Sequence, residues 1–362
     1  MAGLTRRQAS LAAMAAFAMP AQAARLLPAY PETTPGRAFQ FPQDHGAHPE
    51  FRTEWWYVTG WLDAPGGGPG LGFQVTFFRT RPETDQRNPS AFAPKQILFA
   101  HAALSDPAGK RLVHDQRAAR AGFGLAQARL GDADVVIDDW RLWREPSGGF
   151  RARVAGADFA FDLVFRPTQP PLLQGQGGYS RKGPRPEQAS YYYSLPQLAV
   201  SGRLRQGRRW RRASGRAWMD REWSSSILAP GAVGWDWTGI NLDDGGALMA
   251  FQVRGLGGAP VWAGGSLRQA GGVPVEFGPG DVSFTAARHW RSPRTGAVYP
   301  VETTLAVRLP SGARRWRLRP LFDDQELDSR AAGGPIYWEG AVTAPGGRGY
   351  LELTGYAGAL KL

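Results

Sequence analysis

The segment WYVTGWLDAPGGGPGLGFQVTF, residues 56–77, recurs in altered form later in the chain. Residues 235–255 read WDWTGINLDDGGALMAFQVRG, again an aromatic strand, Thr-Gly, a turn with Asp and Gly, and Phe-Gln-Val. Two further pairs of segments match in the same order: WREPSGG (143–149) with WRSPRTG (290–296), and GRAWMDREW (215–223) with GRGYLELTGY (347–356). Three matches in one order predict an internal duplication.

Each copy has the pattern of antiparallel strands. Short alternating stretches such as GFQVTFF and YLELTGY predict strands, and no helical period runs through the sequence. The 362 residues include 47 glycines and 29 prolines, which suits many strands joined by tight turns. A barrel of roughly eight strands has room for side chains and one small ligand. We therefore predict an all-β protein with two tandem antiparallel β-barrel domains, residues 37–226 and 227–362.

The first 23 residues are predicted to be a signal peptide. They contain the pair Arg6-Arg7, an uncharged run of Ala, Leu and Met, and the small-residue site Ala21-Gln22-Ala23. The apolar run is too short for a permanent anchor, and paired arginines before it resemble a twin-arginine signal. We therefore expect export and a periplasmic or secreted location, with an amphipathic N-terminal helix as the alternative.

The chain is strongly basic and has no cysteine. Its formal charge of +12 falls by the two charges of Arg6 and Arg7 to +10, and the lack of cysteine excludes disulfides and thiolate chemistry. Exported proteins rarely meet nucleic acid, so the charge favours an anionic membrane surface or an acidic partner. In the basic stretch 203–216, Gly207 is typical of a hairpin tip with charges facing solvent.

Glu54 has no acidic counterpart in the second copy. Positions that both copies share indicate barrel packing, whereas positions found in one copy are free to be functional. The shared set is Trp56, Thr59, Gly60, Phe73, Gln74 and Val75, matched by Trp235, Thr238, Gly239, Phe251, Gln252 and Val253. The same offset places Val233 opposite Glu54. Glu54 is therefore a candidate catalytic or interdomain residue and its neighbour Trp55 a candidate substrate contact; a solvated strand end is the alternative.

The stretch GRAWMDREWSSS, 215–226, carries the strongest candidate for chemistry. On a strand, Asp220 and Glu222 share a face with Trp218, with the two acidic Cα atoms about 7 Å apart, and Arg221 lies on the opposite face. Two carboxyls near indoles titrate differently, and the more desolvated one donates a proton. Acid-catalysed addition of water, or hydrolysis, needs such a pair. The alternative is an edge strand whose acids pair with surface arginines.

Further candidate substrate contacts lie on other strands. In SYYYSLPQLAVSG, Tyr191 and Tyr193 share one face, where their phenols can line a pocket or simply pack. His101, in LFAHAALSD, is a candidate substrate contact. The alternative is a hydrogen-bonded residue of the core. The sequence contains neither the zinc-protease H-E-x-x-H nor the G-x-S-x-G of α/β-hydrolases, and no phosphate-binding glycine loop. We predict no metal and no cofactor.

Several of these segments together resemble the AttH / carotenoid 1,2-hydratase family of bacterial secreted proteins. They are HPEFRTEWWYVTGWL, FAHAALSD, YYYSLPQLAVSG, GRAWMDREW, GWDW, and YWEGAV with GRGYLELTGY. The resemblance covers nearly the whole mature chain and implies two tandem lipocalin-like β-barrel domains. Members are commonly called predicted secreted hydrolases, and many occur alongside ABC-type permeases of the lipoprotein-export kind. One branch hydrates the terminal double bond of acyclic carotenoids without a redox cofactor.

The resemblance also implies roles for single residues. Asp220 matches the acidic position of the strand motif and would donate the proton, and Glu222 would hold the cation or the water. The apolar substrate would lie between Trp218, Trp223 and Tyr193. In the hydratases the sequence of this strand resembles H-D-H-N-W. Residues 219–223 here read Met-Asp-Arg-Glu-Trp, so the two histidines of the hydratase strand have no counterpart.

Two functions therefore follow from the sequence. The first is an exported enzyme that binds an elongated apolar molecule, isoprenoid or lipid, and adds water to it or hydrolyses it through Asp220 and Glu222. The second is a periplasmic carrier, without catalysis, that presents a lipid or lipoprotein to an ABC-type transporter. The basic surface and a fold that serves as a container support the carrier.

Overall fold

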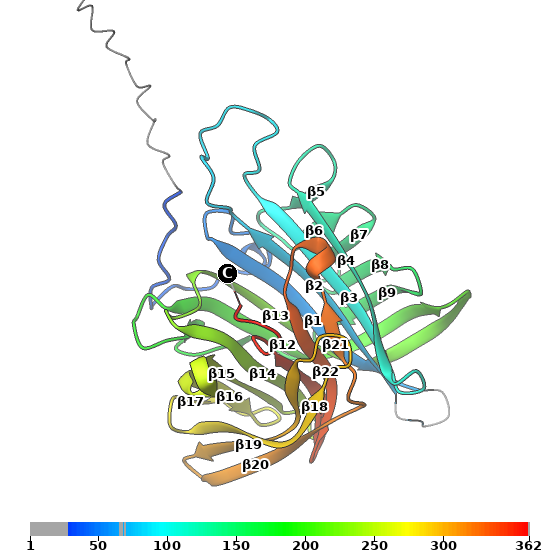
Figure 1. The fold of residues 1–362 in the computed structure, drawn as a ribbon, viewed down its shortest axis with the longest axis vertical. Coiled ribbons are helices and arrows are strands. Elements are labelled where there is room, and N and C mark those ends of the chain that lie inside the picture. The colour runs from blue at the N-terminus through cyan, green and yellow to red at the C-terminus, as the bar shows by residue number, and fades with distance from the viewer. Residues whose placement is uncertain (1–27, 65–67, 69, 361–362) are drawn as a thin grey trace, which may run out of the picture.

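The computed structural model describes residues 28–64, 68 and 70–360, so the predicted signal peptide lies outside the described residues. In this part the chain forms strands and three short 3-10 turns, Gln43–His45, Leu256–Gly258 and Arg330–Ala332, and no α-helix. Among the same residues no helix could cross a membrane. The prediction of an all-β fold is confirmed (Figure 1).

The N-terminal half forms one antiparallel sheet of 13 strands. These are β1 (Thr53–Leu62), β2 (Leu71–Thr80), β3 (Ile97–Asp106), β4 (Arg111–Arg120), β5 (Ala126–Ala128), β6 (Asp134–Ile137), β7 (Trp140–Arg144), β8 (Phe150–Ala155), β9 (Phe159–Arg166), β10 (Leu172–Leu173), β11 (Tyr179–Arg181), β12 (Ala189–Gln206) and β13 (Arg209–Ser226).

The C-terminal half forms a second antiparallel sheet of 10 strands. These are β14 (Ala232–Leu242), β15 (Ala247–Gly255), β16 (Pro260–Arg268), β17 (Val275–Phe277), β18 (Val282–Arg291), β19 (Val298–Leu309), β20 (Gly312–Pro320), β21 (Glu326–Asp328), β22 (Ile336–Ala344) and β23 (Gly347–Leu353). The chain passes from one sheet to the other between Ser226 and Ala232. The division of the chain into two domains, 37–226 and 227–362, stays a prediction.

The two sheets have the same strand order, as the duplication predicts. The first runs β4-β3-β2-β1-β13-β12-β9-β8-β7, and the second runs β17-β16-β15-β14-β23-β22-β20-β19-β18. In each, the first long strand pairs with the strand that ends the copy, β1 with β13 and β14 with β23. Each sheet also curls toward its own edges, because β4 contacts β6 in the first and β16 contacts β18 in the second.

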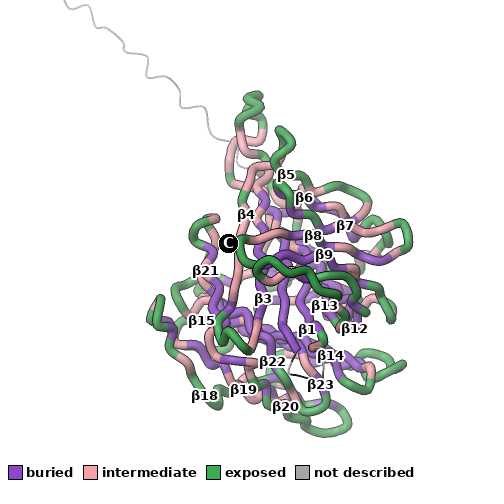
Figure 2. Tube along the Cα trace, turned by 90° about the vertical axis from the view of Figure 1, so that its right-hand side faces the viewer, coloured by how far each residue is buried: buried purple, intermediate pink, exposed green. Residues whose placement is uncertain are grey.

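Each curled sheet encloses its own apolar core (Figure 2). In the first, Trp56, Phe73 and Val75 point inward and are fully buried, because alternate residues of a strand face opposite sides. This confirms barrel packing for these three residues, whereas Gln74 faces the second sheet and donates to the hydroxyl of Tyr337 there. In the second copy the matching Phe251 and Val253 point outward instead and join a cluster between the sheets. The prediction is wrong for these residues because the second hairpin turns the other set of alternate residues to its core, with Leu248 and Ala250 pointing inward in place of Phe251 and Val253.

The seam between the sheets is a third buried cluster. It contains aromatic side chains from both halves, including Tyr57, Trp61, Trp218, Trp237 and Tyr350. The sheets lie close together at Gly72 of β2, where a Cβ would be 2.6 Å from both the Cβ of Ala341 and the hydroxyl of Tyr350. Any side chain at position 72 would force the sheets apart. Outward-facing residues of β1 and β13 are therefore covered by the second sheet rather than exposed to solvent.

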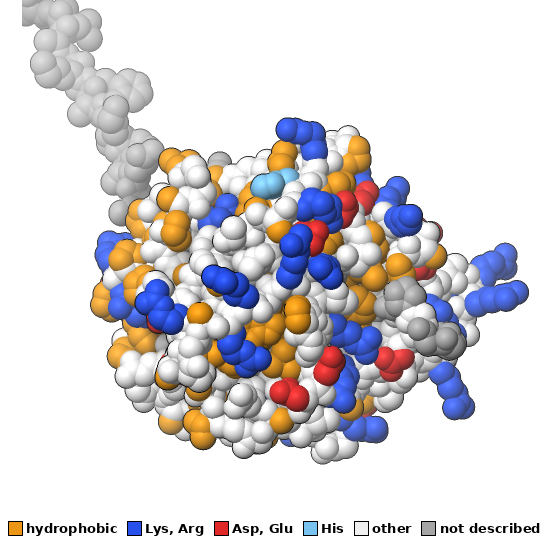
Figure 3. Space-filling view, turned by 90° about the horizontal axis from the view of Figure 1, so that it is seen from below, with side chains coloured by type: hydrophobic (Ala, Val, Ile, Leu, Met, Phe, Trp, Pro, Cys, Tyr) orange, Lys and Arg blue, Asp and Glu red, His pale blue; other side chains and the backbone are white. Residues whose placement is uncertain are grey.

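The basic stretch is the tip of the long β12–β13 hairpin. Gly207 has a φ of 56° at the turn, which is the conformation that glycine adopts at no steric cost. This confirms the predicted hairpin, which projects from the side of the molecule (Figure 1). Lys and Arg side chains are also spread over the face shown in Figure 3, where acidic side chains are fewer.

Candidate active site

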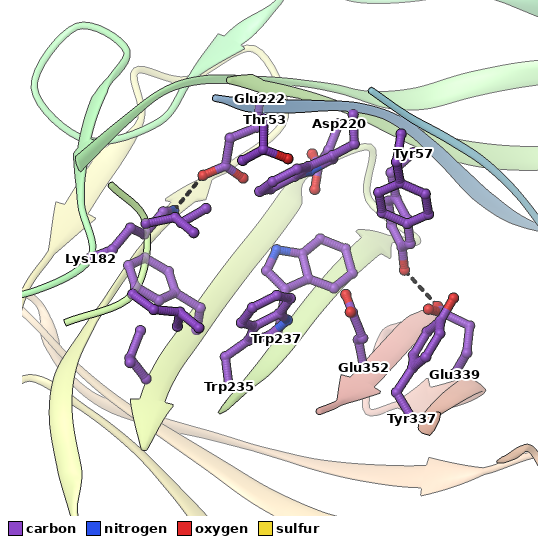
Figure 4. Close-up of a pocket in the computed structure, with 16 residues that line it drawn as sticks. Thr53, Tyr57, Lys182, Asp220, Glu222, Trp235, Trp237, Tyr337, Glu339 and Glu352 are labelled. Carbon is purple, nitrogen blue, oxygen red and sulfur yellow. Dashed lines mark hydrogen bonds and ion pairs between the residues drawn. The ribbon is translucent and has the colours of Figure 1, made fainter. Parts of the chain in front are cut away.

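A cavity of about 110 Å³ lies at the seam, walled by both sheets (Figure 4). Strands β1, β2 and β13 supply one wall, and β14, β15, β22 and β23 supply the other. Its lining consists of aromatic and aliphatic residues around a set of carboxyl groups: Thr53, Trp55, Tyr57, Phe78, Lys182, Asp220, Glu222, Ile227, Leu228, Trp235, Trp237, Phe251, Val253, Tyr337, Glu339 and Glu352. The cavity therefore lies between the two sheets.

Asp220 lies on this wall because β13 turns alternate residues toward the seam. Its carboxyl accepts hydrogen bonds from Ser194 Oγ at 2.6 Å and Trp218 Nε1 at 2.7 Å on one oxygen, and from the Tyr192 hydroxyl at 2.7 Å on the other. Ser194 is the direct cross-strand neighbour of Asp220 on β12.

The ionisation of Asp220 is balanced near neutrality. Burial raises the pKa of its carboxyl to about 7, and the nearby charge of Glu222 also raises it, while the three donors lower it. The described part of the chain pairs no Lys or Arg with this carboxyl within salt-bridge distance. Asp220 is therefore a carboxyl that both gives and accepts a proton at neutral pH.

Glu222, two residues along the same face, has a cation partner. Lys182 Nζ lies 3.0 Å from Glu222 Oε1, and the Ser190 hydroxyl donates to the same oxygen. Lys182 also donates to Ser180 Oγ at 3.0 Å and lies over the rings of Tyr192 and Phe251. The two carboxyls of the strand thus differ, because Glu222 is held in an ion pair and Asp220 is held by neutral donors.

The opposite wall adds two more carboxyls, Glu339 of β22 and Glu352 of β23. Tyr57 donates to Glu339 Oε1 at 2.7 Å across the seam (Figure 4). Burial, with the charge of Glu352, raises the pKa of Glu339 well above its ordinary value. Burial also raises the pKa of Glu352 to about 8, with the charges of Asp220 and Glu222 acting in the same direction. Both groups are therefore mainly neutral at pH 7.

Indole and phenol rings form the apolar part of the cavity. Trp55, Trp235 and Trp237 line it, and Tyr57 packs edge-on against Trp237 with 5.3 Å between ring centroids. Trp237 Nε1 donates to the Tyr192 hydroxyl at 3.0 Å, which orients the phenol that holds Asp220. Such rings bury flat apolar ligands, and their faces attract cations.

The structure brings together part of the predicted site. Asp220, Glu222 and Trp55 line the cavity. Trp218 is outside this lining and donates a hydrogen bond to Asp220. Arg221 faces the other way, as predicted, and pairs with Glu54.

Glu54 lies away from the cavity, inside the first barrel. It is fully buried between Arg79, 2.6 Å away, and Arg221, and it accepts the backbone N–H of His48. Burial opposes its ionisation, but Arg221 and Arg79 hold its pKa well below the ordinary range. This network is structural, and we assign Glu54 no catalytic role.

Three predicted substrate contacts also lie inside the first barrel. Tyr191, Tyr193 and Trp223 belong to its core, and Tyr193 bonds Nδ1 of His45 at 2.6 Å. The alternation of β12 was predicted correctly, but the residue that faces the seam is Tyr192.

His101 lies beside the cavity rather than in its lining. Its Nδ1 is 2.9 Å from the hydroxyl of the lining residue Tyr337, and burial lowers its pKa to about 3, so the ring is neutral. His101 therefore contacts the site only through Tyr337.

The wall of the cavity that the second sheet forms was not predicted from the sequence. One signal was present for Glu352, because the match of GRAWMDREW with GRGYLELTGY places Glu352 opposite Asp220. Lys182, Tyr192 and Glu339 had no such signal. Across residues 28–64, 68 and 70–360, no group of three His, Asp or Glu side chains is arranged to hold a metal ion.

Comparison with known proteins agrees with this architecture. The family model described as AttH-like matches residues 32–356. The chain belongs to the AttH-like family. A crystal structure described as an AttH from Nitrosomonas europaea is 54% identical, with a TM-score of 0.83, and the match covers 90% of this chain and 99% of that one. The family assignment thus rests on both sequence and structure.

More distant solved structures share the fold of this AttH-like protein. Kievitone hydratase from Nectria haematococca is 15% identical, with a TM-score of 0.64, over 91% of this chain and 98% of that one. CghA is 12% identical, with a TM-score of 0.51, over 91% and 95%. At these identities the likeness shows the fold alone. None of the curated proteins matches the chain significantly.

Proposed function

We propose that the protein binds an elongated apolar molecule, of isoprenoid or lipid type, in the seam cavity and adds water to it or hydrolyses it. The observation that carries this proposal is Asp220, a buried carboxyl with a pKa of about 7 on the wall of a cavity lined by aromatic rings. Support also comes from the hydratase that shares the fold.

Water addition needs only the groups that line the cavity. Asp220 transfers its proton to one carbon of an alkene, and the π electrons form the new C–H bond. The neighbouring carbon becomes a cation, which the faces of Trp235 and Trp237 and the new carboxylate stabilise. Water adds to the cation and returns one proton to Asp220. The sum is alkene plus water giving alcohol, with no oxidation or reduction.

The hydrogen-bond donors around Asp220 suit this cycle. Ser194, Trp218 and Tyr192 stabilise the carboxylate that forms when the proton leaves. Burial favours the protonated form that starts the cycle. These opposing effects keep the group poised between its two states.

The roles predicted for the second carboxyl change in this scheme. Glu222 is paired with Lys182, so we propose that it tunes the charge beside Asp220 rather than holding the cation itself. Export, a transporter partner and the carrier function stay predictions, and the carrier is the outcome if Asp220 has no chemical role.

The test uses labelled water. Wild type and Asp220→Asn are each incubated with a lipid extract of the source organism in H₂¹⁸O, and products that gain one labelled oxygen are sought by mass spectrometry. Asp158→Asn, an exposed acid before β9, is the matched control. We expect labelled product with wild type and the control and none with Asp220→Asn. If all three bind the same unaltered lipid and release no labelled product, the protein is a carrier.

A further inference from the structure

Glu339 has a polar atom that nothing in the described chain satisfies. Its side chain is fully buried, and its Oε2 makes no hydrogen bond, although Oε1 accepts from Tyr57 at 2.7 Å. The residue lines the seam cavity (Figure 4). A buried polar atom without a partner is costly and needs an explanation, such as a bound molecule.

The free oxygen has the chemistry of a donor. Burial and the charge of Glu352 favour the neutral form of Glu339, and a neutral carboxylic acid carries one O–H. Since Tyr57 donates to Oε1, that oxygen acts as the carbonyl, and Oε2 carries the hydrogen. The missing partner is therefore an acceptor.

The neighbouring groups do not supply this acceptor. The hydroxyl of Tyr337 is engaged by Gln74 Nε2 at 3.2 Å and by His101 Nδ1 at 2.9 Å. No hydrogen bond joins Glu339 to Glu352 among the contacts of the described residues. Because Glu339 lines the cavity, a molecule bound there is a further source of the acceptor.

The charges around the cavity select an uncharged acceptor. Among its lining residues the one ammonium, that of Lys182, is already paired with Glu222. An anionic headgroup would therefore lie at low dielectric beside the ionised fraction of Asp220, with no unpaired cation to balance its charge. A hydroxyl, ether or carbonyl oxygen carries no such penalty.

We infer that the Glu339 end of the cavity binds an uncharged oxygen of the substrate, so that the ligand is an oxygenated isoprenoid or similar amphipathic molecule rather than a pure hydrocarbon. Tyr57 is the positioning residue that orients the carboxyl. This inference rests on the proposed function for the reactive group at Asp220, but ligand binding tests it separately from catalysis.

The experiment measures binding of four probes built on a ten-carbon acyclic isoprenoid skeleton: geraniol, its methyl ether, geranate and β-myrcene. Quenching of tryptophan fluorescence reports occupancy, because three indoles line the cavity. The protein carries Asp220→Asn, so no turnover disturbs the equilibrium. We expect the alcohol and the ether to bind about tenfold more tightly than the hydrocarbon and the carboxylate, the effect of one hydrogen bond.

Two variants decide the role of Glu339. Glu339→Gln keeps a donor and an acceptor in the same volume, so the preference for oxygen should persist. Glu339→Leu removes both, so all uncharged probes should bind equally. Thermal unfolding of each variant confirms that it is folded. If the Asp220→Asn protein binds β-myrcene as tightly as geraniol, or if adding Glu339→Leu to it keeps the preference for oxygen, the inference is overturned whatever the labelled-water assay shows.

Discussion

Lys182 lies 3.0 Å from Glu222 at the edge of the seam cavity, and it gives that carboxylate the ammonium partner that Asp220 lacks. The two acids stand two residues apart on one face of β13. Glu222 raises the pKa of Asp220 through its charge, and Lys182 offsets part of that charge. Burial is the main cause of the raised pKa of Asp220, and the Lys182–Glu222 pair adjusts it further.

Changing this pair should move the pH dependence of activity. A proton donor works below its pKa, so activity should fall as the pH rises through about 7. Glu222→Gln removes the negative charge and leaves Lys182, which lowers the pKa of Asp220 and moves this fall to lower pH. Lys182→Met should move it to higher pH. The measurement is kcat/KM against pH for the two variants; a shift in the same direction for both would contradict the account.

The stability of the protein should also depend on Asp220. Its pKa of about 7 lies above the ordinary 3.8, so between those values the folded state holds a proton that the unfolded state has released. The free energy of unfolding therefore falls with rising pH, by about 1.4 kcal/mol per pH unit for one such group. Asp220→Asn removes this pH dependence. The free energy of unfolding of the variant, minus that of wild type, should therefore increase with pH by the same amount per pH unit.

Urea unfolding at several pH values measures the slope. The comparison uses the difference between the two proteins, which cancels the opposite trend of low-pKa acids such as Glu54. A difference that stays constant from pH 5 to pH 7 is the result that the account does not allow, because it would mean that Asp220 is ionised throughout this range.

Glu54 should matter for folding and not for binding. Glu54→Gln leaves Arg79 and Arg221, both almost fully buried, without their carboxylate, and breaking a buried ion pair costs about 3–5 kcal/mol. Chemical unfolding should show this loss, while the probes above still bind the folded variant. Reduced affinity with unchanged stability would instead return Glu54 to the site.

The β12–β13 hairpin should bind anionic membranes. Arg208, Arg209 and Arg212 are exposed near its tip, beside the partly exposed Trp210. Each such charge contributes about 1 kcal/mol near an anionic surface, so replacing all three by Gln should weaken binding to phosphatidylglycerol vesicles at least about tenfold. Phosphatidylcholine vesicles are the control. Equal binding of both proteins to the anionic vesicles would mean that the hairpin is only a solvated edge.

The sequence allows the fold and one wall of the site to be predicted, for reasons that individual residues make clear. Alternation along β13 placed Asp220, Glu222 and Trp218 on one face, and the duplication predicted two sheets of one topology. Alternation cannot say what covers a face, since that depends on how the second sheet docks.

This limit explains the residues that were missed or misplaced. Tyr191 and Tyr193 were expected in a pocket, but their side of β12 faces the core of the first barrel. Glu339 comes from β22, and only the docked second sheet brings it to within 2.7 Å of Tyr57. No local pattern in either strand encodes that contact.

The pKa of Asp220 in the folded protein can be measured directly. Infrared difference spectra between wild type and Asp220→Asn, recorded over a range of pH, isolate the protonated carboxyl band of this residue. We expect the band to disappear as the pH rises, with a midpoint near pH 7. A midpoint close to the ordinary 3.8 would show that Asp220 is a carboxylate at neutral pH and would contradict its role as the proton donor.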